Sequence, residues 1–129
     1  MADINLPVGV SFEASQTVTE NDTASKYGSG LVAVFATPAM VALMENASLN
    51  AVIPYLPSGF NTVGVEIAVS HVKATPINQV VKCKATLVKV DGRKLDFEVV
   101  ATDEEGLIGK GTHSRFVIET EKFMAKLKK

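Results

Sequence analysis

Several residue types that mark specialised proteins are scarce in this chain of 129 residues. It has no tryptophan and a single cysteine, Cys83, which cannot form an internal disulfide. It also has no excess of basic charge, since 13 Lys and Arg residues stand against 14 Asp and Glu residues. The formal net charge of −1 provides no general attraction for phosphate backbones, so nucleic acid is not an expected partner.

Long apolar runs and a signal-type beginning are also missing. The start "MADINLPVGV" lacks a positively charged segment followed by a long apolar stretch, and no run approaches the roughly 20 residues of a membrane span. We therefore expect a cytoplasmic protein with no membrane partner. The length and the 47% hydrophobic content predict one globular domain over residues 1–129.

Familiar catalytic motifs are absent too. There is no glycine-rich phosphate loop after a strand, no Gly-x-Ser-x-Gly elbow and no pair of Cys or His residues at zinc spacing. These absences argue against a metal site and against nucleotide hydrolysis. Cys83 has no base beside it in the sequence and is more typical of a packed strand residue than of a nucleophile.

What is present is one strongly apolar segment, "VFATPAMVALMENASLNAV", at residues 34–52. Thr37 followed by Pro38 is typical of a helix start, because Thr can cap free N–H groups and Pro fits the first turn. The helix should end near Val52, since Pro54 follows. Its apolar residues occupy almost every face, so near-total burial is predicted.

Strands are expected on both sides of this helix. A strand at 10–18 precedes a polar loop at 19–30, and the tail "ETEKFMAKLKK" has the pattern of a short amphipathic helix. Asp-Gly at position 91 and Glu-Gly at position 105 are typical of hairpin turns. Four strands after the helix are predicted at residues 62–74, 80–90, 94–102 and 107–119.

One apolar helix among long strands predicts an α+β fold in which an antiparallel sheet curls around the helix. Such a sheet leaves a long edge strand exposed, and exposed edges invite pairing with another strand. A homodimer joined through a continuous sheet is therefore expected.

Two ionisable residues interrupt the apolar pattern. Glu45 lies amid apolar helix residues, and Glu is seldom buried unless it is paired or has a function. Two interpretations of His71 and Glu45 stay open. In the first, His71 is a core or edge histidine and Glu45 faces solvent or pairs with a base such as Arg115. In the second, the two residues form an acid–base pair. The alternating row predicted to face the helix consists of Val63, Val65, Ile67, Val69 and His71.

Thr37 has two candidate roles at the helix start. It can cap the helix, and it can lie where free N–H groups and the helix dipole would stabilise an oxyanion. Eight residues separate Thr37 from Glu45, or about 12 Å at about 1.5 Å per helical residue. One small reacting group would not reach both within one helix, and contributions from two protomers would solve the spacing.

Gly64 and Arg115 complete the candidate set. Gly64 is either a bulge or sheet-curving glycine, or a place where the backbone approaches a ligand and offers its N–H. His113, Arg115 and Val117 alternate on one strand face. Charges of this kind are usually solvated, although an arginine can bind a phosphate or hold a carboxylate.

Three stretches, "VFATPAMVALMENA", "VGVEIAVSHVKATP" and "GKGTHSRFVIETEKFMAKLK", resemble the hotdog-fold thioesterases, most closely the fluoroacetyl-CoA thioesterase branch. The similarity runs over most of the chain in the same order. In that family a Thr at the helix start, a Glu eight residues later and a His twenty-six residues beyond it form the catalytic set, and Thr37, Glu45 and His71 occupy these positions. Gly64 matches a family glycine whose backbone contacts the acyl group or thioester, and Arg115 lies in a matching "TH-x-R" segment.

The resemblance implies a homodimer, with sites near the subunit interface, that hydrolyses an acyl-CoA thioester to a carboxylic acid and free CoA without a cofactor. Glu45 would be the nucleophile or general base, His71 would position the thioester or protonate the leaving thiolate, and Thr37 would orient and stabilise the oxyanion. Hydration of an enoyl-CoA on the same fold is a related alternative. A noncatalytic acyl-CoA or small-ligand binding module and a purely structural dimer are alternatives of other classes.

One segment departs from the family pattern. In the fluoroacetyl-specific enzyme the segment before the helix forms a lid with phenylalanines that screen the acyl group. Here "NDTASKYGSGLVAV" is shorter and has Tyr27 as its only aromatic residue. The departure predicts a common small acyl-CoA as the substrate rather than selectivity for the fluoroacetyl group.

Overall fold

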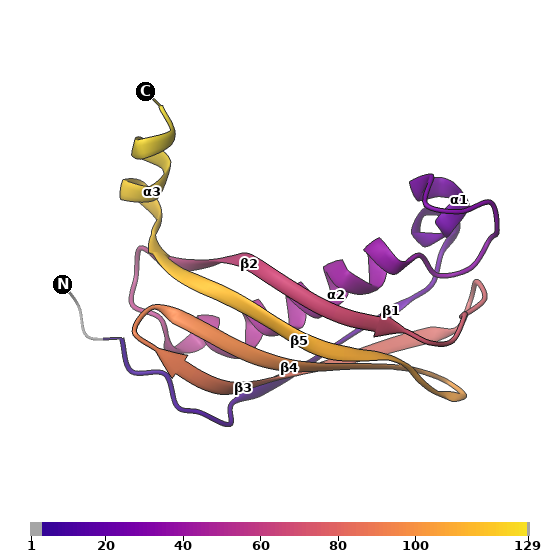
Figure 1. Ribbon diagram of the computed structural model, residues 1–129, viewed down its shortest axis with the longest axis horizontal. Helices are drawn as coiled ribbons and strands as arrows, with labels where there is room; N and C mark the ends of the chain where they lie inside the picture. The colour runs from indigo at the N-terminus through magenta and orange to yellow at the C-terminus, as the bar shows by residue number, and fades with distance from the viewer. Residues whose placement is uncertain (1–3, 129) are drawn as a thin grey trace.

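The computed structural model describes residues 4–128, in which five strands and one long helix supply most of the regular structure (Figure 1). The strands are β1 (Ser11–Thr17), β2 (Phe60–His71), β3 (Val80–Asp91), β4 (Lys94–Asp103) and β5 (Gly106–Glu119). The helices are α1 (Ala24–Tyr27), α2 (Thr37–Val52) and α3 (Thr120–Leu127), with short 3₁₀ turns at η1 (Glu20–Asp22) and η2 (Ile53–Tyr55).

The strands form one antiparallel sheet in the order β1-β3-β4-β5-β2. Tight hairpins join β3 to β4 and β4 to β5, and Gly92 and Gly106 take the positive φ angles, 61° and 139°, that these turns require. Both predicted turns are therefore confirmed. Strand β2 is an edge of the sheet, as is β1, so one side of each has no neighbouring strand within the described chain.

Helix α2 lies along one face of the sheet (Figure 1). It packs mainly against β3 and β1, and less against β4 and β2. Fully burying a large apolar side chain contributes roughly 1.5–3 kcal/mol, so this interface supplies much of the folding free energy. Its largest fully buried side chains are Phe35, Met40, Met44, Leu87, Leu95 and Phe97.

The outer side of α2 remains uncovered. Only eight of its 16 residues are buried, so the predicted near-total burial is wrong for the single chain. The reason is geometric, because the sheet of one chain covers the helix from one side and leaves the opposite side without a covering layer among the described residues. Val41, Ala42, Glu45 and Leu49 lie on the side away from the core and are exposed or half-buried.

A bulge in β2 changes which side chains face the helix. The pairing with β5 passes from Gly64 opposite Arg115 to Glu66 opposite Ser114, and this leaves Val65 as an extra residue. Gly64 therefore faces inward before the bulge, and the inward row resumes at Ile67 after it. The predicted row is wrong for Val63 and Val65, which line a groove on the opposite face, and right for Ile67, Val69 and His71.

Two glycines of β5 let its neighbours approach closely. A Cβ at Gly109 would lie 2.6 Å from the sulfur of Met40, and a Cβ at Gly111 would overlap the carbonyl oxygen of Ala68. Gly109 is paired with His71 across the strands. Its missing side chain therefore lets Met40 bring the first half of α2 close to the end of β2.

The remaining differences from the predicted elements are small. The strand predicted at 62–74 runs from Phe60 to His71, and the predicted tail helix spans Thr120–Leu127, with position 129 outside the described residues. The segment predicted as a polar loop contains η1 and α1, because Thr23 caps α1 by accepting a hydrogen bond from the Lys26 N–H. Among the described residues no helix is long and apolar enough to cross a membrane.

Candidate active site

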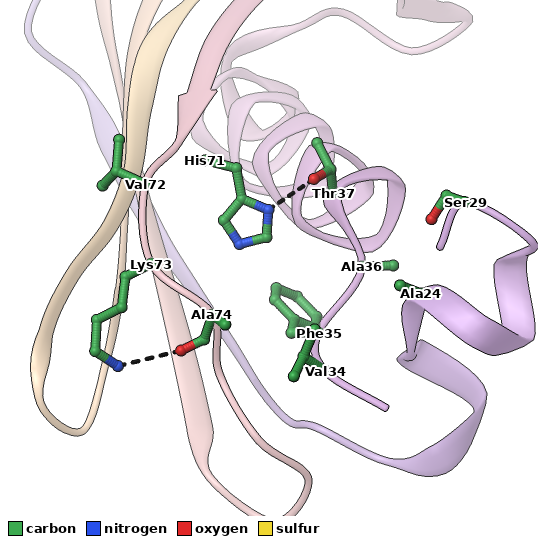
Figure 2. A pocket seen from close by; sticks show the side chains of 10 residues that line it. All are labelled: Ala24, Ser29, Val34, Phe35, Ala36, Thr37, His71, Val72, Lys73 and Ala74. Carbon is green, nitrogen blue, oxygen red and sulfur yellow. Dashed lines mark hydrogen bonds between the residues drawn. The ribbon is translucent and has the colours of Figure 1, made fainter. Parts of the chain in front are cut away.

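Thr37 and His71 meet where α2 begins and β2 ends. The Oγ1 atom of Thr37 lies 2.8 Å from Nδ1 of His71, a hydrogen bond drawn in Figure 2. The predicted capping role of Thr37 is wrong, since Ala36 occupies the N-cap position and no side chain caps the helix. Because α2 begins at Thr37, the hydroxyl is free to point across to the strand and orient the imidazole.

The second ring nitrogen of His71, Nε2, is positioned to bind a ligand. Among the described residues, Nε2 of His71 is buried and has no hydrogen-bond partner. Burial lowers the pKa of His71, with a smaller opposing contribution from a backbone hydrogen bond at Lys73, so the ring is neutral at pH 7. The ring of Phe35 meets it edge-on, with centroids 6.5 Å apart. A neutral imidazole with one bonded nitrogen and one available nitrogen can donate or accept a proton at the available position.

A cavity of about 370 Å³ opens beside this pair (Figure 2). Lys73 lies in one wall of the cavity and forms an ion pair, in which its Nζ lies 2.6 Å from Oδ2 of Asp103. Burial would raise the pKa of Asp103, but hydrogen bonds from Lys73, Glu105 and Thr75 outweigh it and lower that pKa to about 2. The cavity is lined by Ala24, Ser29, Val34, Phe35, Ala36, Thr37, His71, Val72, Lys73 and Ala74.

Glu45 lies elsewhere, on the uncovered side of α2 and next to β2 and β5. Its Oε1 atom is 3.9 Å from Nη1 of Arg115, and 45% of its side-chain surface is exposed. A Cβ added to Gly64 would lie 3.5 Å from the same carboxylate oxygen. The interpretation in which Glu45 pairs with Arg115 is therefore confirmed, and the carboxylate faces the backbone of Gly64.

Arg115 is buried, with 6% of its surface exposed, so the expectation of a solvated charge is wrong. Its Nε–H donates to Oγ1 of Thr62 at 2.8 Å, and an Nη2–H donates to the Thr62 carbonyl oxygen at 3.0 Å. An Nη1–H donates to Nε2 of His113 at 3.2 Å. Burial lowers the pKa of Arg115 and the charge of Glu45 opposes this, yet a guanidinium stays cationic in proteins.

Sequence reasoning assigned no role to Thr62 and His113, although both support Arg115. The signal for His113 was present in the alternation of His113, Arg115 and Val117, which the structure places on the inward face of β5. Thr62 carried no comparable signal, because its inward position depends on the bulge that follows it. Cys83 is fully buried, and burial raises the pKa of its thiol to about 12, which agrees with the predicted packing role.

The candidate residues therefore form two separate groups within one chain. The first joins Thr37 to His71, and the second places Glu45 beside Gly64 and Arg115. Among residues 4–128 no hydrogen bond or ion pair connects the groups. The seven steps along the chain from Gly64 to His71 span about 23 Å of extended strand at about 3.3 Å each.

Comparisons with known proteins give a consistent result. The profile of the family described as FlK, fluoroacetyl-CoA-specific thioesterase, matches residues 18–121. The fluoroacetyl-CoA thioesterase of Streptantibioticus cattleyicolor is 47% identical over 95 residues, which are 74% of this chain and 68% of that protein.

Solved structures agree with the sequence comparison. A structure of the fluoroacetyl-CoA thioesterase FlK superposes with a TM-score of 0.89 at 40% identity, covering 95% of this chain and 96% of that one. A thioesterase superfamily member from Thermus thermophilus superposes with a TM-score of 0.88 at 27% identity, covering 95% and 91%. The predicted α+β hotdog architecture is confirmed by these neighbours and by the sheet described above.

Proposed function

The chain belongs to the fluoroacetyl-CoA-specific thioesterase family and is a thioester hydrolase, and from this premise we propose that it hydrolyses a small acyl-CoA at Thr37, Glu45 and His71. The observation that carries the proposal is the hydrogen bond between Thr37 and His71 at the cavity. This bond leaves the buried Nε2 of His71 available at the place where the helix begins. A neutral imidazole and the positive end of a helix dipole suit a reaction that develops an oxyanion and a thiolate.

The two groups of residues come together in a homodimer that pairs β2 with the β2 strand of a second copy. Two-fold antiparallel pairing places the beginning of one strand beside the end of the other. With the two-fold axis near Ala68, Gly64 lies opposite position 72 of the partner. Glu45 of one protomer then meets Thr37 and His71 of the other, and each dimer has two composite sites.

The free edge of β2 and the uncovered face of α2 support this arrangement. An unpaired strand edge favours association, and α2 packs against β2 much less than against β3 or β1. The partner would cover both surfaces. The same proposal places residues 1–129 in one domain that acts in the cytoplasm.

The proposed chemistry follows from the roles of these side chains. Glu45 removes a proton from water, which adds to the thioester carbonyl, or its carboxylate attacks that carbon directly and water hydrolyses the resulting anhydride. The N-terminus of α2 and Thr37 stabilise the oxyanion, and the C–S bond then breaks. In the first route the proton taken by Glu45 passes to the thiolate, and in the second the water that hydrolyses the anhydride supplies that proton and restores the carboxylate. Nε2 of His71 positions the sulfur or passes the proton on.

The acyl group is proposed to be small and unfluorinated. The cavity beside His71 has a volume of about 370 Å³, and its lining from the segment before α2 includes Phe35. Tyr27 in the preceding segment is half exposed and does not line this cavity, so it provides no aromatic screen there. Arg115 and Gly64 would contact the acyl end from the other side of the site.

Replacing Glu45 tests the catalytic assignment. Glu45→Gln keeps the size of the side chain but removes the base, and general-base catalysis is typically worth about 10² to 10⁴ in rate. Thiol release should be measured with acetyl-, propionyl-, butyryl- and fluoroacetyl-CoA, because the panel also reports the preferred acyl group. A loss of kcat of that size supports the assignment, whereas unchanged turnover would remove Glu45 from the mechanism.

A further inference from the structure

Arg115 sits in a buried polar network beneath Glu45 and Gly64. Each of its three nitrogens donates one hydrogen bond, two of them to Thr62 and one to Nε2 of His113. A guanidinium has five N–H donors, so one N–H remains on each terminal nitrogen. One of these nitrogens lies 3.9 Å from the carboxylate of Glu45. The orientation of the guanidinium is therefore fixed by its hydrogen bonds to Thr62 and His113, and these two groups do not themselves reach the carboxylate.

His113 is held in one tautomer. It is 2% exposed, and its Nδ1 lies 2.7 Å from the carbonyl oxygen of Glu66. A carbonyl only accepts hydrogen bonds, so Nδ1 carries the proton and Nε2 offers its lone pair to the Nη1–H of Arg115. The ring cannot turn over without losing both bonds. Burial lowers the pKa of His113 and the charge of Arg115 acts in the same direction, which agrees with a neutral ring.

The Glu66 carbonyl belongs to the bulge that follows Gly64. Because the register of β2 slips by one residue here, this carbonyl bonds to the His113 ring. A Cβ at Gly64 would lie 3.2 Å from Cε1 of His113, 3.5 Å from Nη1 of Arg115 and 3.5 Å from Oε1 of Glu45. One imidazole thus contacts the bulge and the arginine that surround the carboxylate.

We propose that His113 is a positioning residue for Glu45, acting through Arg115. The inference rests on the proposed function, in which Glu45 is the base or nucleophile. His113 does not touch the substrate. It fixes the acceptor that orients the guanidinium, and the guanidinium fixes the carboxylate.

Two substitutions separate the two contacts of His113. Asn can place an N–H where Nδ1 lies but has no acceptor at the position of Nε2, whereas the longer Gln can place its amide oxygen there. His113→Gln should therefore keep kcat within about threefold of wild type. His113→Asn should lower kcat by about 10- to 100-fold, since a shift of about 1 Å in a catalytic group can reduce rate about 100-fold.

The readout separates positioning from a purely structural role. A positioning role lowers kcat in His113→Asn by a larger factor than it changes KM, because Glu45 acts on the transition state, whereas a change in KM reports the contact of Arg115 with the acyl end. A structural role lowers the melting temperature and the amount of folded protein while kcat per folded site is unchanged. Equal kcat values for wild type and His113→Asn, or equal losses in the Asn and Gln variants, would overturn the proposal.

Thr62 provides a second, independent pair of variants if His113→Asn does not fold. Thr62→Val removes the hydroxyl that accepts from Nε–H of Arg115, and Thr62→Ser retains it. The proposal predicts a lower kcat in the Val variant and recovery in the Ser variant. Equal kcat values in the two would contradict it.

Glu45→Gln, measured beside these variants, keeps the two proposals distinguishable. If Glu45→Gln retains wild-type turnover, the proposed function fails. If Glu45→Gln is inactive while His113→Asn and Thr62→Val both retain wild-type kcat, only the positioning role of His113 fails.

Discussion

The two ends of β2 hold polar groups in opposite ways. At the C-terminal end of the strand, His71 forms a hydrogen bond to one hydroxyl, and the second nitrogen of the ring has no partner within the described chain. Near its start, Arg115 makes three hydrogen bonds in a buried network, and each has a defined acceptor. The first group is left incomplete and is suited to meet a ligand. The second is complete and is suited to hold one carboxylate still.

This contrast predicts different consequences of mutation at the two ends. Substitutions at the His71 end should change turnover and leave the fold intact, because few other groups depend on these side chains. Substitutions in the Arg115 network should change both, because a buried polar group that loses its partner destabilises the protein by about 1–3 kcal/mol.

The largest effect on rate is expected for His71→Ala. Loss of the imidazole should lower kcat by about 10² to 10⁴, as for other proton-transferring or thiolate-positioning groups. The free energy of unfolding should change little, because within the described residues the imidazole gives up few contacts, its hydrogen bond to Thr37 and the backbone interaction at Lys73 among them. Thiol release and urea denaturation measured on the same preparation would check both statements, and a large loss of stability would weaken the contrast.

Arg115→Met should give the largest loss of stability. Met fills much of the volume of Arg but donates nothing, so His113 and Thr62 lose their charged partner inside the protein. A loss of about 2–4 kcal/mol is expected from hydrogen bonds to a charged group. The value is not larger because Glu45, the ion-pair partner, is 45% exposed and can be solvated. Denaturant midpoints would measure it, and a change below about 0.5 kcal/mol would contradict a structural role for the network.

Thr37 should show a smaller effect that depends on its hydroxyl. Thr37→Val is nearly isosteric and removes the bond to His71, so we expect kcat to fall by about tenfold, which corresponds to about 1.4 kcal/mol in the barrier. Thr37→Ser retains the hydroxyl and should keep most of the activity. If the Ser and Val variants turn over at the same rate, the hydroxyl does not orient the imidazole.

The smallest effect is expected from pH. Burial lowers the pKa values of His71 and His113, so the unfolded chain takes up protons first as the pH falls below about 6.5. Stability should therefore fall from that pH until the folded-state pKa values are passed. The Asp103 carboxyl, with a pKa of about 2, adds a separate loss below about pH 4.

Urea denaturation at several pH values would measure this dependence. His113→Gln should make the slope below about pH 6.5 shallower, because one of the two contributing groups is gone. His113 faces Arg115 on its own strand, Glu45 on α2 and the Glu66 carbonyl on β2, and Phe97 of β4 lies beside its ring. An unchanged slope in this variant would show that His113 does not titrate in the window.

Much of the fold could be predicted from local signals. Thr37-Pro38 and the proline at position 54 gave the limits of α2, and the glycines at positions 92 and 106 gave the hairpins. The apolar helix, the long strands and their order sufficed for the architecture. These features depend on residues that are near one another in the chain, which is why a sequence displays them.

The site could be predicted only in part. The bulge at Val65 could not be found from alternation, because it depends on the register between β2 and β5. The burial of Arg115 follows from the same register. Thr37, Glu45 and His71 could be selected, and eight residues of helix already separated Thr37 from Glu45, but the pairing of His71 with Thr37 depends on where β2 ends in three dimensions.

The central claim is that each site combines Glu45 of one protomer with His71 of the other, and mixed dimers test it directly. Glu45→Gln and His71→Ala should each be inactive alone. When equal amounts are unfolded and refolded together, half of the dimers are mixed and each mixed dimer has one intact site, so about a quarter of wild-type activity is predicted. Thr37→Val mixed with His71→Ala is the matched control, because both changes fall in the same group and no intact site forms. Activity that stays at the level of the separate variants, in a mixture where mixed dimers are present, would contradict the account.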